Sequence, residues 1–401
     1  MSKLTKHRFS DLYSMSSGIS STKEQAGHGA PFLSFSAVFN NYFVPSELLD
    51  LMNASKKQQE TYSIKQGDIF LTRTSEVVDE LAMSSVAIKD YPLATYSGFL
   101  KRLRPTQNDV SYHKFMAFYL RSSLFRKTMT NNAVMTLRAS LNEDIFSYLD
   151  LLLPEFDEQV KVGDLLYVIN QKIELNKRIN IELESMAKML YDYWFVQFDF
   201  PNADGKPYKT SGGAMVYNEK IKREIPEGWT ESEIQNLIGP TPKEKKVLSK
   251  EYEEKGSIPI IDQSQKFICG FTCDNTKRIK PEIAHVIFGD HSRTVKLVNF
   301  DYARGADGTQ VLEANTSAVP CYLLYQLVLD IDLSNYGYAR HFKFLKESRC
   351  VVPEEVTAQK YQETVAPWYE KIKSNIFQNY QLEYLRDWLL PMLMNGQVTV
   401  K

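Results

Sequence analysis

The chain has 401 residues, 43% of them hydrophobic and 12% aromatic, and a formal net charge of −1. This length predicts two or three domains, and the composition excludes a disordered chain. No run of about 18 apolar residues is present, and the polar N-terminus lacks the apolar region of a signal peptide, so we expect a cytoplasmic protein without a membrane span.

The net charge alone argues against a nucleic-acid partner, but the charges are distributed unevenly along the chain. Residues 1–152 carry 17 Lys and Arg against 14 Asp and Glu, and residues 201–352 carry 21 against 20. Residues 153–200 carry 5 against 9, and residues 353–401 carry 5 against 6. Two mildly basic blocks therefore alternate with two acidic segments. We expect any phosphate-binding surface to be local, or to be completed by a partner.

The first block, residues 1–153, has mixed α/β character. Its short apolar runs at 31–35 and 68–72 predict strands, and the longer run at 112–127 predicts a helix. The block ends in an apolar strand that leads directly into Pro154. We assign these residues to one domain.

A long helix is predicted for residues 154–200, where seam residues alternate in steps of four and three. This is the spacing of the a and d positions of a coiled coil. The seam consists of Val162, Leu166, Ile169, Ile173, Asn176, Asn180, Leu183, Ala187, Leu190 and Trp194.

A connector, residues 201–224, separates this helix from a second α/β block at 225–352. The Gly, Pro and Asp residues of the connector are typical of turns. In the second block, runs at 257–261 and 285–288 predict strands, and the run at 319–329 predicts a helix. This block also ends in an apolar strand that leads into a proline.

Residues 353–401 predict a second long helix with the same rhythm. Its seam consists of Tyr361, Val365, Trp368, Ile372, Asn375, Asn379, Leu382, Arg386, Leu389 and Leu393. Pro367 lies within this stretch and lacks the amide hydrogen that a helix interior uses. We therefore expect a kink or an interruption in the first turns.

The two helical stretches repeat one another at an offset of 199 residues, which brings Pro154 onto Pro353. Each seam carries two asparagines at matching places, Asn176 and Asn180 in the first and Asn375 and Asn379 in the second. A polar seam residue costs stability but specifies register and partner. We predict that the helices pair as an antiparallel coiled coil with these asparagines fixing the register. Two unrelated amphipathic helices on separate cores are the alternative.

No familiar catalytic motif is present in the sequence: there is no Walker A loop, Gly-x-Gly-x-x-Gly, Asn/Asp-Pro-Pro-Tyr, Gly-x-Ser-x-Gly or His-Glu-x-x-His. The stretch 253–255 fits a nuclease Glu-x-Lys only formally, because its charge-dense surroundings indicate a solvated surface. His291 beside Asp290 is weak evidence for a general base. Cys269 and Cys273 have no companion pair of Cys or His at zinc-site spacing, so we expect reduced thiols and no bound metal. Because the catalytic motifs are also missing, we expect no catalytic residue in this chain.

Four polar and basic clusters, at 71–76, 289–296, 304–310 and 336–343, have the composition of DNA-reading loops. Arginine favours guanine edges, glutamine favours adenine, and Lys and Arg also hold phosphates. Ordinary polar turns are the alternative for each cluster alone.

Arg138 occupies a place in the first block that is similar to that of Arg340 in the second. The candidate DNA-binding residues are Arg73, Thr74, Ser75, Arg138, His291, Ser292, Arg293, Thr294, Lys296, Arg304, Thr309, Gln310, Tyr338, Arg340, His341 and Lys343.

Taken together, these features resemble the specificity subunit of type I restriction–modification systems over nearly the whole chain. The segments that carry the resemblance are 285–294, 305–309 and 337–341 for a recognition domain, 153–159 for the entry to the central helix, and 206–213 with 225–229 for the connector and the second domain. The second helix lacks the Glu-Gln entry, and the first block lacks the Pro-x-Gly-Trp start.

The resemblance implies an α+β chain in which two α/β target recognition domains are separated by two long helices, with double-stranded DNA as the ligand. It also implies two methylase subunits and two restriction subunits as partners. S-adenosylmethionine, ATP and Mg²⁺ are expected in those partners and not in this chain. A DNA-modifying enzyme with an unrecognised nuclease or methyltransferase site is one alternative, and a structural coiled-coil scaffold is another.

The central helix predicts the form of the DNA target. Its seam spans roughly 50 Å at about 1.5 Å per residue. Recognition domains docked near its ends would read two half-sites about one DNA turn apart, near 34–36 Å. We therefore expect two short half-sites around a non-specific gap.

Overall fold

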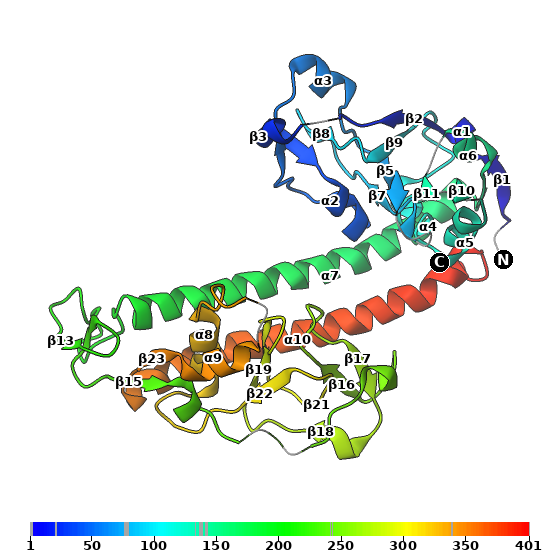
Figure 1. Ribbon diagram of the computed structural model, residues 1–401. Coiled ribbons are helices and arrows are strands. Elements are labelled where there is room, and N and C mark those ends of the chain that lie inside the picture. The colour runs from blue at the N-terminus through cyan, green and yellow to red at the C-terminus, as the bar shows by residue number, and fades with distance from the viewer. Residues whose placement is uncertain are drawn as a thin grey trace. The chain divides into compact units, whose positions relative to one another are not determined.

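The computed structural model describes residues 3–20, 22–75, 80–132, 134–135, 139–140, 143–240, 242, 244–337 and 340–400. The chain divides into two compact units. Unit 1 comprises Met1–Glu174 and Asn379–Lys401, and unit 2 comprises Leu175–Gln378. Each unit includes one part of each of two long helices, α7 (Phe156–Tyr191) and α10 (Glu355–Met394) (Figure 1). The predicted domain borders at 153, 200, 224 and 352 stay a prediction.

Unit 1 combines short helices with small sheets. Its strands are β1 (Thr5–Arg8), β2 (Tyr13–Ser17), β3 (Ala26–Leu33), β4 (Leu51–Met52), β5 (Ile69–Thr72), β6 (Thr74–Ser75), β7 (Ser84–Val86), β8 (Thr95–Tyr96), β9 (Leu100–Pro105), β10 (Val134–Met135), β11 (Ala139–Ser140) and β12 (Asp150–Leu153). Its shorter helices are α1 (Phe9–Leu12), α2 (Phe35–Asn40), α3 (Lys56–Thr61), α4 (His113–Tyr119), α5 (Ser123–Asn132) and α6 (Glu143–Tyr148). The largest sheet has the order β2-β9-β5-β7 and is antiparallel throughout.

Helix α4 lies in the core of unit 1, where Phe115 to Leu120 are all buried. A short helix that is apolar all round must be covered on every side. Strand β5 and the start of α7 contribute to the same core, with Ile69, Val162 and Leu166 buried in it. From α10, Leu390 and Leu393 complete it. The last turns of α10 are therefore part of the hydrophobic core of unit 1.

Unit 2 repeats this mixture of elements. Its strands are β13 (Met215–Asn218), β14 (Arg223–Pro226), β15 (Thr230–Glu233), β16 (Ile258–Ile261), β17 (Gly270–Thr272), β18 (Arg278–Ile279), β19 (His285–Gly289), β20 (Val295–Val298), β21 (Tyr302–Arg304), β22 (Thr309–Leu312) and β23 (Arg349–Val352). Its shorter helices are α8 (Cys321–Asp330) and α9 (His341–Glu347), and a π-helix, Asp192–Val196, follows α7. The sheets have the orders β17-β16-β21-β18 and β20-β19-β22.

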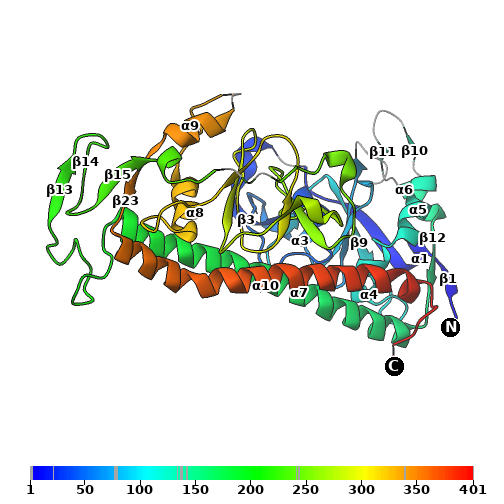
Figure 2. The same ribbon diagram turned by 90° about the horizontal axis from the view of Figure 1, so that it is seen from below.

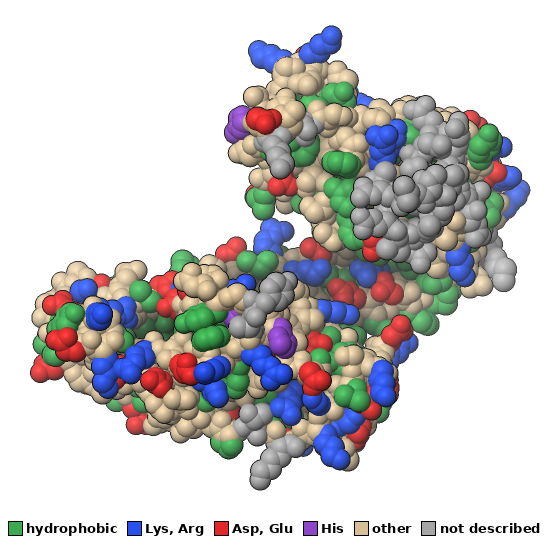
Figure 3. All heavy atoms as spheres, in the orientation of Figure 1, with side chains coloured by type: hydrophobic (Ala, Val, Ile, Leu, Met, Phe, Trp, Pro, Cys, Tyr) green, Lys and Arg blue, Asp and Glu red, His purple; other side chains and the backbone are tan. Residues whose placement is uncertain are grey.

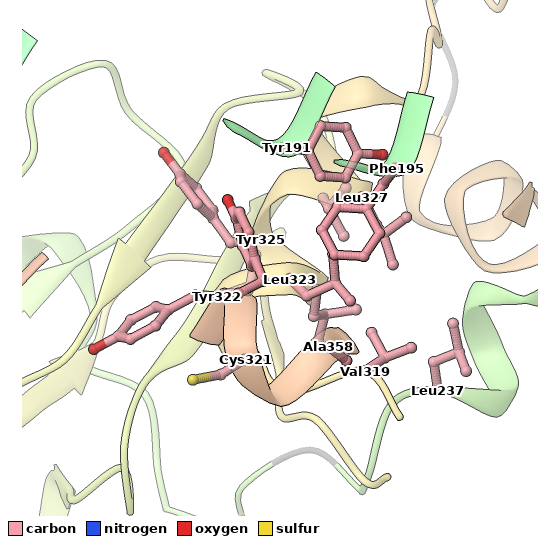
Figure 4. Close-up of a cluster of buried hydrophobic side chains, with 14 of the residues drawn as sticks. Tyr191, Phe195, Leu237, Val319, Cys321, Tyr322, Leu323, Tyr325, Leu327 and Ala358 are labelled. Carbon is pink, nitrogen blue, oxygen red and sulfur yellow. The ribbon is translucent and has the colours of Figure 1, made fainter. Parts of the chain in front are cut away.

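Helix α8 is the counterpart of α4 and is buried from Cys321 to Val328. Its side chains pack with Tyr191 at the end of α7, Phe195 of the following π-helix and Ala358 of α10 (Figure 4). This cluster joins both long helices to the sheets of unit 2, because Val286 and Leu312 belong to it as well.

Both units use the same device at the entry to a long helix. In unit 1, β1 pairs antiparallel with β12, with Thr5 opposite Leu153. In unit 2, β15 pairs antiparallel with β23, with Thr230 opposite Val352. Each pair closes its block immediately before the proline that precedes α7 or α10, so the repeat that the sequence predicts is present in the structure.

The long helices lie side by side and run antiparallel (Figures 1 and 2). In unit 2 the Tyr361 hydroxyl donates a hydrogen bond to the Ala187 carbonyl oxygen, 3.1 Å away. In unit 1 the Asn379 side-chain amide donates to the Ile173 carbonyl oxygen, 3.2 Å away. Every predicted seam residue of both helices is buried or half-buried. The predicted pairing is confirmed, and the alternative of two unrelated helices is wrong.

Several local predictions differ from the structure. Helix α10 continues through Pro367, whose ring lies on the exposed side, while Val365 and Tyr369 beside it are packed in the core. The predicted interruption is therefore wrong, because burial of the opposite face outweighs one missing hydrogen bond. The predicted helix 112–127 is two helices, separated near Ser122, whose hydroxyl caps α5. The predicted strand 31–35 ends at Leu33, and Phe35 begins α2.

The connector also contains more structure than turns, because β13 and β14 form an antiparallel hairpin there. Phe200 stacks between Tyr208 and Trp229, at ring-centroid distances of 4.6 and 4.8 Å. This stack fixes the hairpin to the core of unit 2. Within the described part of the chain, no helix has the length and the apolar character that a membrane crossing needs.

Candidate nucleic-acid interface

Three of the predicted clusters meet at one edge of the unit 2 sheets. Strands β16 and β21 run parallel, with Ile261 beside Arg304, so the loops that follow them leave in the same direction. Strand β19 ends at Gly289, opposite Thr309 at the start of β22. We call the loops 262–266, 290–294 and 305–308, residues 333–337 and 340, and the start of α9 the unit 2 edge.

Gln263 holds three of these loops together. Its side-chain Nε2 donates to the Asp307 carbonyl oxygen at 2.8 Å, and its Oε1 accepts from the His291 backbone nitrogen at 3.2 Å. The Ser292 hydroxyl donates to the Gln263 carbonyl oxygen at 2.6 Å. A Cβ on Gly308 would lie within about 3 Å of the Gln263 amide, so only glycine allows this approach.

Asp290 attaches α9 to the same edge. Its carboxylate, on a buried residue, accepts from the Phe342 backbone nitrogen at 2.9 Å, and its backbone nitrogen donates to the Gly308 carbonyl oxygen at 2.8 Å. The His341 ring lies between the carbonyl oxygens of Asp290 and Tyr336, at 3.0 and 3.1 Å. A carboxylate at a helix N-terminus is also favoured by the partial positive charge there.

The exposed cations among the described residues of the unit 2 edge are Lys266, Arg293, Arg340 and Lys343. The backbone of Arg293 has a φ of +59°, which is uncommon for a residue other than glycine. The Arg293 guanidinium donates a hydrogen bond to the Leu333 carbonyl oxygen, 3.2 Å away. Among the described residues, the ion pair of Lys343 is a long contact of 3.9 Å to Glu347. An ion pair of this length at the surface contributes little, so Lys343 is available to an anion.

Some predicted DNA-binding side chains face inward instead. Lys296 is 4% exposed, and its ammonium group donates to the carbonyl oxygens of Asp262 and Lys266, both at 2.7 Å. Burial lowers the pKa of Lys296. His341 and Thr309 are also buried, and Arg304 is half-buried, with a long contact to the Glu244 carbonyl oxygen. These contacts favour holding the loops in place over touching DNA.

The remaining predicted residues of this edge have intermediate or full exposure. His291 and Ser292 are exposed, Thr294 and Gln310 are half-buried, and Gln265 Nε2 donates to the Thr294 hydroxyl at 3.2 Å. Tyr338 lies outside the described residues. On the face of unit 2 seen in Figure 3, Lys and Arg side chains are interspersed with Asp and Glu, so the surface is mixed in charge.

In unit 1, backbone pairing brings the predicted cluster at 71–76 beside the strand that follows Arg138 in the sequence. Strand β6, Thr74–Ser75, pairs antiparallel with β11, with Ser140 opposite Thr74 and Ala139 opposite Ser75. Arg73 directly precedes β6, is exposed, and donates its backbone nitrogen to the Phe99 carbonyl oxygen at 2.9 Å. Arg138 lies outside the described residues. We call Arg73, β6 and β11 the unit 1 edge.

The seam asparagines bridge the two long helices. Asn176 donates to the Gln378 side-chain oxygen at 2.7 Å, and Asn375 donates to the Asn180 side-chain oxygen at 2.8 Å. Asn379 bonds the backbone of Ile173, as described above. Their side-chain geometry suits the predicted role in register, since a shift of the helices would leave buried amides unpaired.

The structure also places the residues considered for catalysis or metal binding. Across the described ranges, no group of three or more His, Cys, Asp or Glu could hold a metal ion. Cys269 donates its thiol to the Ile260 carbonyl oxygen, and burial raises the pKa of this thiol to about 12. Glu253 is exposed at the surface of unit 2.

Sequence reasoning missed Gln263 and Asp262, which organise the unit 2 edge. The signal for both was available, because they directly follow the strand predicted at 257–261, and side chains at strand ends often carry function. Asp262 accepts from the Ser264 backbone nitrogen at 2.8 Å and so shapes the same loop.

Known proteins resemble the chain along most of its length. Residues 10–185 match the family described as the type I restriction modification DNA specificity domain. The type I restriction enzyme MjaIX specificity subunit of Methanocaldococcus jannaschii is 23% identical over 83% of this chain and 79% of that protein. The type I restriction enzyme HindI specificity subunit of Haemophilus influenzae is 24% identical over 92% of this chain and 94% of that protein.

A solved structure shares the fold. The S subunit of a type I restriction-modification system from M. genitalium has a TM-score of 0.57 to this chain at 16% sequence identity, and the similarity covers 98% of this chain and 96% of that one. This similarity supports the arrangement of mixed α/β blocks and two long helices.

Proposed function

We propose that the chain is a specificity subunit of a type I restriction–modification system, because residues 10–185 match that specificity domain and two such subunits are similar to most of the chain. In this role it selects the DNA sequence on which a larger complex acts. Each unit supplies one reading edge, and each edge reads one half of a bipartite target. The observation that carries this proposal is the convergence of three polar clusters, far apart in sequence, at the unit 2 edge.

Within this proposal, the exposed arginines make the direct contacts. Arg293 and Arg340 at the unit 2 edge and Arg73 at the unit 1 edge have the donors that bind guanine edges or phosphates. Gln263, Asp290 and Lys296 hold the loops that carry them. Specificity thus comes from a rigid edge as well as from the residues that touch bases.

The chain itself contributes recognition and no chemistry in this proposal. Methylase subunits would hold S-adenosylmethionine, and restriction subunits would supply ATP-driven cleavage with Mg²⁺. We propose two copies of each per chain, acting in the cytoplasm. A mixed rather than uniformly basic surface fits this division, because partners then supply part of the phosphate contact.

Exposed apolar side chains on the long helices offer surfaces for such partners. In unit 2, Met186, Met189 and Tyr193 follow one another along α7 and into the π-helix at the spacing of one helix face, and Met189 is 59% exposed. In unit 1, Tyr384 and Trp388 are exposed on α10, Trp388 to 56%. Large apolar side chains grouped on a helix face are typical of protein–protein contacts.

The modification motif of the assembled complex tests the proposal. Cells that express the chain with its methylase subunits should carry methylation at two short half-sites around a fixed gap, detectable by methylation-sensitive sequencing. Insertion of one heptad into both long helices should lengthen the gap by roughly three base pairs, since about 10 Å is added at 3.4 Å per base pair. The half-sites themselves should not change.

Two results would contradict this function. A continuous short motif, or half-sites rewritten by the insertion, would reject a bipartite target. Methylation or cleavage of DNA by the purified chain alone, with S-adenosylmethionine, ATP and Mg²⁺ present, would instead support a DNA-modifying enzyme.

A further inference from the structure

Each long helix carries a buried glutamine that caps the central helix of a recognition domain. In unit 1, Gln159 of α7 is 1% exposed, and its side-chain Oε1 accepts from the Tyr112 backbone nitrogen at 2.9 Å, at the start of α4. Its Nε2 donates to the carbonyl oxygens of Val110 and Pro154, each at 2.9 Å. The side-chain amide of Gln159 therefore links the residue before α7, the loop before α4 and the start of α4.

The second glutamine has the same role in unit 2. Gln362 of α10 is 5% exposed, and its Oε1 accepts from the Tyr322 backbone nitrogen, 3.1 Å away in the first turn of α8. Its Nε2 donates to the Cys321 sulfur at 3.3 Å. Neither α4 nor α8 has a side-chain cap of its own. A backbone amide at the start of each buried helix thus donates to a side chain of a long helix.

Close packing surrounds the glutamine in unit 1. A Cβ on Gly163, one turn after Gln159, would lie 2.7 Å from the Phe115 backbone nitrogen, so α4 touches the backbone of α7. Asp164 accepts from the Tyr112 hydroxyl at 2.9 Å and from the Lys114 ammonium at 2.8 Å.

In unit 2, the contact between the buried helix α8 and the long helix α10 is made by tyrosine side chains instead of a glycine. Gln326 Nε2 of α8 donates to the Tyr369 hydroxyl at 2.9 Å, and the Tyr322 and Tyr369 rings stack at 4.6 Å. Both docking sites are therefore specific, and each places one recognition-domain helix against one turn of a long helix.

Gln159 and Gln362 do not occupy matching positions in the internal repeat of the two long helices. The repeat brings Gln362 onto Gly163 and not onto Gln159, because Gln159 is five positions after Pro154 and Gln362 nine after Pro353. Four residues correspond to about 6 Å, or one helical turn. Helix α8 is therefore capped one turn farther along its long helix than α4 is.

We propose that Gln159 and Gln362 are positioning residues that fix where each recognition domain sits along its long helix and, thereby, the length of the gap between the half-sites. This inference rests on the function proposed above. One base pair is 3.4 Å long, which is less than one helical turn, so a slip of part of a turn changes the gap. A slip would leave the buried amide and the helix N–H without partners, which opposes it.

The test compares gap lengths in Gln159→Ala and Gln362→Ala variants of the full chain, expressed with the methylase subunits. Methylation-sensitive sequencing counts modified sites with the wild-type gap and with gaps one base pair shorter or longer. The preference for the wild-type gap should fall about tenfold in each variant, equivalent to about 1.4 kcal/mol. The half-site sequences should remain unchanged, which distinguishes positioning from base contact.

Two exposed glutamines provide matched controls. Gln171→Ala on α7 and Gln359→Ala on α10 make the same chemical change on the outer side of the same helices, and both should keep a single gap. Gln159→Glu should not keep a single gap, because the carboxylate can no longer donate to Val110 and Pro154.

A single wild-type gap in both alanine variants, with normal complex assembly, overturns the inference. Where the alanine variants do not assemble, an unchanged gap in the milder Gln159→Glu variant overturns it. A continuous motif for the wild-type complex rejects the proposed function itself. A bipartite wild-type motif with unaltered gaps in the variants rejects only the positioning role.

Discussion

The unit 1 edge and the unit 2 edge are built from similar residue types but are held in different ways. The unit 2 edge depends on side chains, because Gln263 and Asp290 bond the backbones of neighbouring loops. The unit 1 edge depends on backbone pairing between β6 and β11. A ladder of backbone bonds tolerates most substitutions, whereas a polar network fails when one member is lost. Under the proposed function, single substitutions should therefore damage the recognition assigned to unit 2 more readily than that assigned to unit 1.

Asp290→Ala should have the largest effect. It removes a buried carboxylate that accepts from the Phe342 backbone nitrogen, and hydrogen bonds to charged groups contribute about 1.5–3 kcal/mol. We expect α9 to detach and the assembled complex to lose affinity for its target. Thermal unfolding and binding to target DNA measure both effects. Asp290→Asn keeps an acceptor oxygen and should cost less, and equal binding by both variants and wild type would contradict this role.

The exposed arginines should come next. Arg293→Ala, Arg340→Ala and Arg73→Ala should each weaken binding by about 1–3 kcal/mol where the side chain reads a base, and relax specificity at one position. A phosphate contact would weaken all sequences alike. Binding of target and scrambled DNA by each assembled complex separates the cases. Arg349→Ala is the control, because this arginine is paired with Glu231 on β15. Unchanged binding in all three variants rejects the assignment.

Lys296→Met tests whether a buried lysine positions a loop or binds phosphate. A positioning role predicts reduced discrimination with an unchanged salt dependence, whereas loss of a phosphate contact reduces the salt slope by about 1. Because burial lowers the pKa of Lys296, the folded state holds this proton less tightly than the unfolded chain. Its contribution to stability therefore increases as pH rises from the folded pKa toward the usual value of 10.5, and Lys296→Met should remove this alkaline dependence.

Asp164→Asn should have the smallest effect. Burial raises the pKa of this carboxyl, but hydrogen bonds from Lys114 and Tyr112 lower it more, so the net direction is down. A lowered folded pKa gives stability that is present above the unfolded value of about 3.8 and is lost as pH falls through the folded pKa. The side chain is half-exposed, so solvent screening keeps the effect below about 1 kcal/mol. Acid unfolding of the variant should show a slightly weaker pH dependence than wild type.

Periodic features of the chain could be predicted from sequence, because they depend on local spacing. The seam residues, the paired asparagines and the strands before Pro154 and Pro353 follow from heptad rhythm and repetition. The continuation of α10 through Pro367 could not be predicted, since it depends on the tertiary packing of Val365 and Tyr369.

The candidate site was predictable in its clusters but not in its orientation. Lys296 and Arg293 belong to the same cluster, yet one is buried under a loop and the other is exposed at a positive φ. Residue type cannot distinguish them, because the outcome depends on which carbonyl oxygens another loop presents. Gln263 was missed for the same reason, as its partners are 28 and 44 residues away in the chain.

The contribution of α10 to the core of unit 1 has a consequence for biosynthesis. Unit 2 is continuous in sequence, whereas unit 1 needs Leu390 and Leu393, which leave the ribosome more than 200 residues after α7 begins. Chains usually fold from the N-terminal domain onward as they are made. Here the second unit can complete its core first, while the first remains open and exposes Val162 and Leu166 to chaperones until translation is nearly finished. Premature termination near residue 378 would thus leave the earlier-made unit, rather than the later one, unfinished.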